Sequence, residues 1–307
     1  MPLPRLPIWG ITAVVDAMPW WLLPLLMALL VGAVCPATGT LLVTQRRLLQ
    51  ANLIAHAVLP GLAVALAVGI DPALGGVVSG VLGALLAERL QRRDGRSHEA
   101  VMNTVLAGFL GLGVLLIPLL NLRLDLESVL FGDLLAVGTT DLGRTLFAAT
   151  SLLLLVGWSY RSLVFLGVDP DGAAAVGLPV RSLRLALACV TALVVVSAMS
   201  AVGVVLVIAL LCAPVLPGLQ QVASLRAAMV RASLVGVALS GAGFALALLL
   251  NLPPGPLIGV ACLGLLLPWS TASLSAQRLC RWAASRAAGA TGCCLGHPRK
   301  PPKPSGP

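Results

Sequence analysis

A histidine and an asparagine lie inside a long apolar stretch near the start of the chain, where polar side chains are costly. Between residues 48 and 70, His56 is surrounded by Leu, Ile, Ala and Val, and Asn52 precedes it by four residues. Residues four apart share one face of a helix, and ionisable side chains in a membrane span usually face a bundle interior or a water-filled path. The pair is typical of a path for a polar solute such as a metal ion, and equally of one buried histidine that hydrogen-bonds a neighbouring helix.

The composition predicts the kind of structure that must hold this pair. Of the 307 residues, 59% are hydrophobic and only 10% are charged, whereas soluble domains carry about 25% charged residues. A membrane-spanning helix needs roughly 20 apolar residues, and stretches of alternating polarity that would build a β-barrel are absent from the sequence. We therefore expect an all-α, polytopic membrane helix bundle with about nine transmembrane helices, between eight and ten.

The net charge of +9 indicates topology rather than nucleic-acid binding. Three of the 20 Lys and Arg residues, Arg5, Arg123 and Arg144, fall outside segments that the positive-inside rule assigns to the cytoplasm. Six acidic residues lie outside or at the outer ends of spans: Asp16, Asp71, Asp125, Glu127, Asp133 and Asp141. We expect a multi-pass membrane protein, with its amino end outside and its carboxyl end inside.

The hydropathy pattern predicts nine spans within a transmembrane domain at residues 20–270. They run near residues 20–43, 48–70, 72–90, 101–120, 141–160, 232–250 and 256–269, with two short spans inside 185–218 that separate near 197–203. Pro60-Gly61 is expected to interrupt the second span, and Gly76 with Gly80 to form a face for close helix packing. Residues 1–19 are predicted to be an outer segment, and 271–307 a basic, largely disordered cytoplasmic tail.

Residues 121–140 are too polar to cross a membrane and too apolar for an ordinary loop. We interpret them as a re-entrant or interfacial segment at the outer mouth, where Asp125, Glu127 and Asp133 meet water. A plain solvated loop is the alternative interpretation.

A short capped helix is predicted on the cytoplasmic side, between Arg161 and Arg184. Asp169 has the character of an N-cap, and Pro170 that of the first helical residue. Gly177 would end the helix, and Pro179 would prevent its continuation. A helix of two turns between spans has no role in lipid, so we favour docking to a partner over a simple connector.

Taken in order, these motifs resemble the membrane permease of bacterial ABC importers for divalent metals (zinc, manganese or iron) over roughly residues 20–270. The resemblance rests on Arg46-Arg47 followed by Ala51-Asn52-Leu53-Ile54-Ala55-His56-Ala57 and Val58–Gly61, Asp125-Leu126 with Leu130–Asp133, Asp169-Pro170 with Gly177-Leu178-Pro179, Val202-Gly203 through Pro214, and Pro254-Gly255. The chain departs from the family at Asn52, where the family usually has aspartate, and at Ala51, where it has glycine. The resemblance favours manganese, and an oxygen-leaning pair suits manganese.

The resemblance implies a transport subunit rather than an enzyme, with Asn52 and His56 on the metal pathway. A separate cytoplasmic ABC ATPase would bind ATP and grip the coupling segment: Asp169, Pro170, Gly177, Leu178 and Pro179. An extracytoplasmic metal-binding protein would deliver the ion. Two copies, as a homodimer, or this chain with a close homologue would enclose the path in the lipid of the bacterial plasma (inner) membrane. No resident cofactor or nucleic acid would be needed. The sequence lacks the GxxxxGK[ST] phosphate loop, so ATP hydrolysis by that chemistry needs a partner.

The alternative is a secondary transporter or channel that moves a cation without an ATPase. Membrane-embedded carboxylates and inverted repeats are typical of that class, and neither is evident in the sequence. An intramembrane enzyme ranks far lower, because there is no HExxH pair.

Overall fold

The structure, a computed structural model, describes residues 21–94, 98–121, 132, 134–219 and 224–266. Within these ranges the regular structure is entirely helical, which confirms the all-α prediction. The described residues up to Leu263 form one compact unit. A second unit begins at Gly264, and the structure describes only its first three residues, 264–266. The predicted outer segment at 1–19 and the tail at 271–307 lie outside the described residues.

Seven of the described helices are long and apolar enough to cross a membrane. They are α2 (Leu22–Thr44), α3 (Leu48–Val68), α4 (Pro72–Asp94), α5 (His98–Leu119), α7 (Thr139–Val168), α9 (Val180–Val202) and α12 (Leu225–Leu250). Shorter elements are η1 (Leu134–Ala136), α8 (Pro170–Ala175), α10 (Val204–Cys212), α11 (Val215–Leu219) and an apolar helix at Pro254–Leu266. Each of the nine predicted apolar spans corresponds to one of the long helices or to one of the two shorter apolar segments, 204–217 and 254–266.

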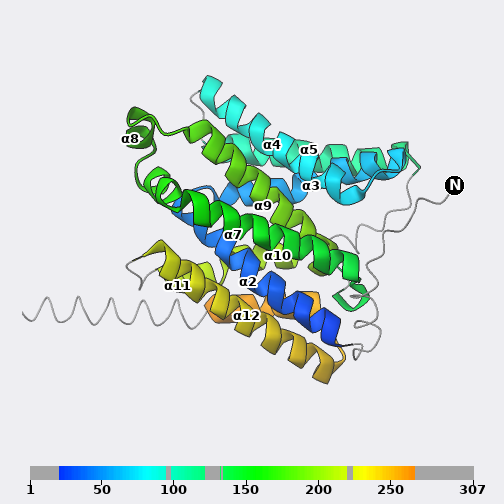
Figure 1. The fold of residues 1–307 in the computed structure, drawn as a ribbon. Coiled ribbons are helices and arrows are strands. Elements are labelled where there is room, and N and C mark those ends of the chain that lie inside the picture. Colours follow the sequence, from blue (N-terminus) through cyan, green and yellow to red (C-terminus); the bar gives the residue numbers. More distant parts are fainter. Residues whose placement is uncertain (1–20, 95–97, 122–131, 133, 220–223, 267–307) are drawn as a thin grey trace, which may run out of the picture. The chain divides into compact units, whose positions relative to one another are not determined.

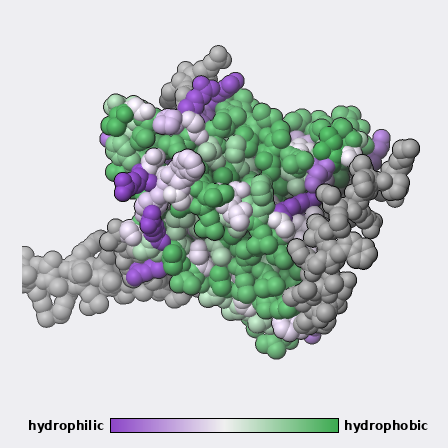
Figure 2. All heavy atoms as spheres, in the orientation of Figure 1, coloured by the Kyte–Doolittle hydropathy of each residue, from purple (hydrophilic) through white to green (hydrophobic). Residues whose placement is uncertain are grey.

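The surface of these helices is apolar in a way that requires lipid. Figure 2 shows a face that is mostly hydrophobic, with hydrophilic residues gathered toward the left and right of the view. Leu154 of α7 is 72% exposed and Trp158 is 95% exposed. Water-soluble proteins rarely carry large contiguous apolar patches, so the chain is a multi-pass membrane protein.

Two groups of helices are visible in Figure 1. In this view α3, α4 and α5 lie together at the top, α2 packs against α12 at the bottom, and α7 and α9 lie between them. The end where α3 and α9 begin and α4 ends is the one that the arginine distribution assigns to the cytoplasm. We call it the inner end, and the opposite one the outer end.

Helices α3 and α4 approach until their backbones touch. A Cβ atom on Gly61 would collide with the carbonyl oxygen of Gly75, so only glycine fits this crossing. Gly76 and Gly80 also face α3, as predicted. The expected interruption at Pro60 was wrong, because α3 continues through it to Val68. Prolines are tolerated inside membrane helices when neighbouring helices enclose them, as α4 and α5 do here.

The crossing of α2 with α12 is equally close. The hydroxyl of Ser233 on α12 donates to the carbonyl oxygen of Ala33 on α2 at 2.9 Å. A Cβ atom on Gly236 would collide with the carbonyl oxygen of Gly32. Small residues and interhelical hydrogen bonds drive helix association in lipid, so this contact joins the first described helix to one near the end of the chain.

Helix α7 is longer than the sequence suggested. It has 30 residues and continues to Val168, although we expected it to end at Tyr160. The backbone departs from helical geometry at Ser159, where φ is −108° and ψ is 17°, so the helix bends there. Leu163 and Leu166 beyond the bend are buried, with exposures of 2% and 5%. Their burial explains why the helix continues past Arg161, which looked like the start of a loop.

The region 185–218 also differs from its prediction. A break does fall within the expected interval, at Gly203, whose φ of 80° suits glycine and interrupts the helix. The first part is nevertheless a full span, because α9 begins at Val180 and takes in Arg181 and Arg184. A second break follows α10, at Ala213 and Pro214.

Candidate functional site

The structure places Asn52 and His56 on one face of α3, near its inner end. Both side chains are half-buried, whereas Leu53, Ala55 and Ala57 around them are fully buried. The Nδ1 atom of His56 is shielded from solvent and has no hydrogen-bond partner among the described residues. The alternative of a histidine bonded through this nitrogen to a neighbouring helix is therefore not observed among the described residues. A buried polar atom without a partner is unusual, because such groups are nearly always satisfied.

We call the face of α3 that carries Leu49, Asn52, His56, Leu59 and Ala63 the stripe, and its side chains are more exposed toward the inner end. Leu49, one turn before Asn52, is half-buried as well. One turn beyond His56 the stripe closes, since Leu59 is 6% exposed and Ala63 is fully buried. Gly113 of α5 packs directly against Leu59 in this closed part. The pair therefore lies where the accessible half of the stripe meets the closed half.

One copy of the chain supplies few ligands for a metal ion. No group of three or more His, Cys, Asp or Glu side chains close enough to hold a metal occurs among the described residues. Asn52 offers an amide oxygen and His56 an imidazole nitrogen, a set of two donors. Transport sites must bind weakly enough to release their ion, and a set of two needs further ligands from elsewhere.

The second part of the site is α8 at the inner end, formed as the sequence predicted. The carboxylate of Asp169 accepts hydrogen bonds from the backbone N–H groups of Asp171 at 3.2 Å and Gly172 at 2.9 Å. Pro170 is the first helical residue, and the chain leaves the helix at Gly177 with a φ of 84°. Pro179 then caps α9, so the two helices are separated by only a few residues.

Helix α8 is held to the bundle by one side and exposes the other. Ala173 is fully buried against Leu166 of α7 and Leu183 of α9, with Leu178 and Val180 packed around them. On the opposite side Ala174 and Ala175 are exposed, and Val176 is 74% exposed. An exposed apolar face on a docked helix beyond the spans is a surface suited to a protein partner.

The cap of α8 can be tested by comparing two substitutions. We expect Asp169→Ala to destabilise α8 by about 1 kcal/mol, because Ala cannot accept the two backbone N–H groups. Asp169→Asn should retain most of that stability, since asparagine caps helices about as well as aspartate. Protease cleavage within 169–179 measures the effect and should become faster in the alanine variant only. Equal cleavage of both variants would show that the cap contributes nothing.

The outer end provides the third part of the site. Asp125, Glu127 and Asp133 lie outside the described residues, so the structure does not place the predicted acidic mouth. Among the described residues nearby, Gly132 packs against the break at Gly203.

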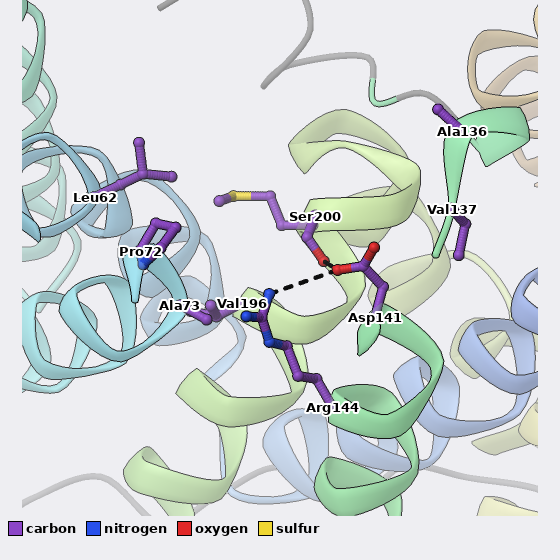
Figure 3. A pocket seen from close by; sticks show the side chains of 10 residues that line it. Leu62, Pro72, Ala73, Ala136, Val137, Asp141, Arg144, Val196 and Ser200 are labelled. Atoms are coloured by element: carbon purple, nitrogen blue, oxygen red, sulfur yellow. Dashed lines mark hydrogen bonds and ion pairs between the residues drawn. The ribbon is translucent and has the colours of Figure 1, made fainter. Parts of the chain in front are cut away.

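A cavity of about 280 Å³ opens at this outer end. Figure 3 shows Leu62 of α3, with Pro72 and Ala73 of α4, on one side, and Asp141 and Arg144 of α7 opposite. Val196, Met199 and Ser200 of α9, with Ala136 and Val137, complete the wall. The cavity thus lies where α3, α4, α7 and α9 meet.

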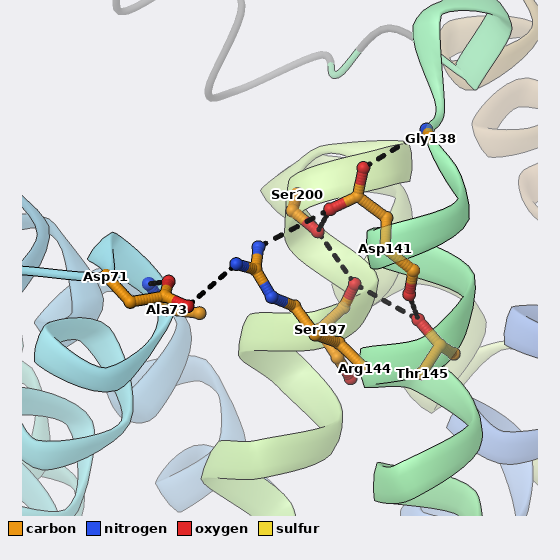
Figure 4. Close-up of polar contacts among 8 residues, drawn as sticks. All are labelled: Asp71, Ala73, Gly138, Asp141, Arg144, Thr145, Ser197 and Ser200. Atoms are coloured by element: carbon orange, nitrogen blue, oxygen red, sulfur yellow. Dashed lines mark hydrogen bonds and ion pairs between the residues drawn. The ribbon is translucent and has the colours of Figure 1, made fainter. Parts of the chain in front are cut away.

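An arginine joins the two sides of this cavity. The Arg144 guanidinium lies 2.8 Å from the carboxylate of Asp71, before α4, and 3.6 Å from that of Asp141 on its own helix (Figure 4). Ser200 of α9 donates to the same Asp141 carboxylate at 3.4 Å. The pairs are partly exposed, with Arg144 at 33% and Asp71 at 40%, so each contributes little stability. Their effect is to hold the turn between α3 and α4 against α7.

Sequence reasoning missed this outer network. Asp71 and Asp141 were counted only as outer charges, and Arg144 only as an exception to the topology rule. The available signal was the spacing of Asp141 and Arg144, since residues three apart on a helix are neighbours.

Comparisons with known proteins agree with this architecture. The model of the ABC 3 transport family matches residues 20–272. The chain is 34% identical over 221 residues to the chelated iron transport system membrane protein YfeD of Yersinia pestis, covering 72% of this chain and 74% of that protein. It is 30% identical over 234 residues to the manganese import system permease protein ScaB of Streptococcus parasanguinis, covering 76% and 84%. The solved structure of PsaBC from Streptococcus pneumoniae in complex with Fab has a TM-score of 0.74 and 28% identity, covering 85% of this chain and 94% of that chain.

Proposed function

The chain belongs to the ABC 3 transport family, and from this premise we propose that it is the permease subunit of an importer that carries a divalent metal ion into the cytoplasm. Manganese is the favoured ion, and iron and zinc are the alternatives. Relatives named for manganese import and for chelated iron transport support this choice. The oxygen of Asn52 beside the nitrogen of His56 also supports it, because oxygen ligands suit manganese.

Two copies of the chain form the path in this proposal. The commonest homo-oligomers of soluble proteins are two-fold symmetric dimers, in which the same surface of each copy meets, and we propose the same arrangement here. Two copies would bring two Asn52 oxygens and two His56 nitrogens to one axis, four donors in place of two. The half-buried stripe of α3 is the surface that would face this axis.

In this proposal, the energy for transport comes from a separate cytoplasmic ATPase that binds α8. The observation that carries this proposal is a capped helix at the inner end, docked through Ala173 and exposing Ala174, Ala175 and Val176. An extracytoplasmic binding protein would deliver the ion at the outer end, beside the cavity that Asp71, Asp141 and Arg144 surround. ATP would bind to the partner, because the chain has no phosphate loop.

Reconstitution of the purified chain into proteoliposomes tests the function. We expect Mn²⁺ accumulation only when the partner ATPase, the binding protein and ATP are all present. The matched control replaces ATP by a nucleotide that cannot be hydrolysed and should give no accumulation. Manganese passage by the chain alone would contradict the proposal and favour a secondary transporter or channel.

A further inference from the structure

A half-buried glutamate near the inner end of α4 lies between two arginines from different helices. The Oε1 atom of Glu88 is 3.4 Å from Nη1 of Arg184 on α9 and 3.7 Å from Nη2 of Arg47, which precedes α3. The side chain of Glu88 is only 16% exposed, and that of Arg47 is equally shielded. One carboxylate of α4 thus joins the start of α3 to α9, which lies about 90 residues later in the chain.

The cluster extends into the buried part of α3. Nη1 of Arg47 donates to Oε1 of Gln50 at 3.1 Å, and Gln50 is only 3% exposed. Glu88 thus gives the guanidinium groups of Arg47 and Arg184 a shared carboxylate in a shielded position. Removal of one partner from a shielded ion pair is costly. The charge of Glu88 therefore helps to hold the start of α3 to α9 at this end.

On one side, the cluster connects to α8. Ala173 of α8 packs against Leu183, which directly precedes Arg184 in the first turns of α9. The backbone N–H of Leu178 donates to the carbonyl oxygen of Ala173 at 3.1 Å, and that of Leu183 to the carbonyl oxygen of Pro179 at 3.1 Å. Figure 1 shows α8 beside the start of α9. A displacement of α8 must therefore carry Arg184 with it.

On the other side, the cluster connects to the metal pathway. Arg47 directly precedes the first residue of α3, and Asn52 and His56 follow within the same continuous helix. Helices move as rigid elements over such short lengths, because their side chains are close-packed against neighbours. A movement of Arg47 relative to α9 therefore repositions the pair that we assign to the ion.

We propose that Glu88 is a positioning residue that transmits movement of α8 and α9 to α3 and so couples ATP hydrolysis to movement of the ion. The inference rests on the proposed function, and it adds a residue outside both the pathway and the ATPase-binding surface. Glu88 touches neither the ion nor the partner. It sets the position of α3 through Arg47 while remaining paired with Arg184.

The test compares Glu88→Gln with the original chain in proteoliposomes that contain the partner ATPase and the binding protein. Glutamine keeps the shape of the side chain and removes its charge. We expect the ATPase to bind and to hydrolyse ATP within twofold of the original rate, while the number of Mn²⁺ ions accumulated per ATP falls at least tenfold. Glu99→Gln is the matched control, because Glu99 is an exposed carboxylate at the start of α5, also at the inner end. It should leave the ratio unchanged.

A conservative change provides the second arm. Glu88→Asp keeps a carboxylate between Arg47 and Arg184 and should keep the ratio at no less than half of the original value. If Glu88→Gln does not reach the membrane, Arg184→Gln breaks the same α4–α9 link and is expected to lower the ratio likewise. If the folded Glu88→Gln and Arg184→Gln variants accumulated as many Mn²⁺ ions per ATP as the original chain, the inference would be overturned and the proposed function would stand. Absence of ATP-dependent uptake by the original chain would instead overturn the proposed function.

Discussion

Replacing His56 with alanine is expected to reduce ATP-dependent Mn²⁺ uptake at least tenfold, with the protein still inserted in the membrane. Imidazole is the one nitrogen donor of the proposed pair, and a twofold-symmetric path would lose two of its four donors at once. A tenfold loss corresponds to about 1.4 kcal/mol, a modest cost for the loss of metal ligands. The fold should tolerate the change, because His56 is half-buried and its Nδ1 has no hydrogen-bond partner to lose among the described residues.

Uptake of radioactive manganese at several concentrations measures this effect, and immunoblotting of membranes measures the amount of protein. Leu49→Ala is the matched control, since Leu49 is half-buried on the same stripe two turns before His56. It should retain uptake within about twofold, because a leucine side chain offers no metal ligand. If His56→Ala took up manganese as fast as the original chain, His56 would not belong to the path.

Replacing Val176 with aspartate is expected to abolish binding of the partner ATPase, with a loss of affinity of about 100-fold or more. The Val176 side chain is 74% exposed at the end of α8. A charge forced into an apolar interface must be desolvated without a partner, which costs several kcal/mol. The helix itself should persist, because the Val176 backbone N–H donates to the carbonyl oxygen of Gly172 whatever the side chain.

Co-purification of the ATPase with the tagged permease checks this result, and uptake should disappear in parallel. Val176→Ile keeps the apolar surface and should bind the ATPase as the original chain does. Undiminished binding to the aspartate variant would mean that α8 is only a connector between α7 and α9.

Local chemistry made some of these features predictable. Each residue of the α8 cap was identified in advance, because an N-cap, a first-turn proline and a terminal glycine act within a few positions of one another. His56 was recognisable as a polar residue in an apolar stretch for the same reason. By contrast, the ends of α7 and α9 were misplaced, since Arg161, Arg181 and Arg184 suggested a loop.

Contacts between distant parts of the chain could not be predicted in this way. Arg184 and Glu88 are 96 positions apart, and Arg144 and Asp71 are 73 apart. One sequence contains no information on which helices are neighbours when every helix is apolar on most of its surface. The Glu88 cluster therefore became visible only with the packing of α4 against α9, and the outer network only with the contact of Asp71 with Arg144 of α7.

The contact of α2 with α12 has a consequence for the biogenesis of the protein. Ser233 and Ala33 are 200 residues apart, so at about 5–20 residues per second the ribosome needs roughly 10–40 s to deliver the second after the first. During that interval the face of α2 that contains Gly32 lies in the bilayer without α12 packed against it. A truncated chain that ended before α12 would leave this face of α2 unpacked, and such a protein would be a target for quality-control proteases. Completion of this fold is therefore governed by one of the last segments to emerge from the translocon, not by the first.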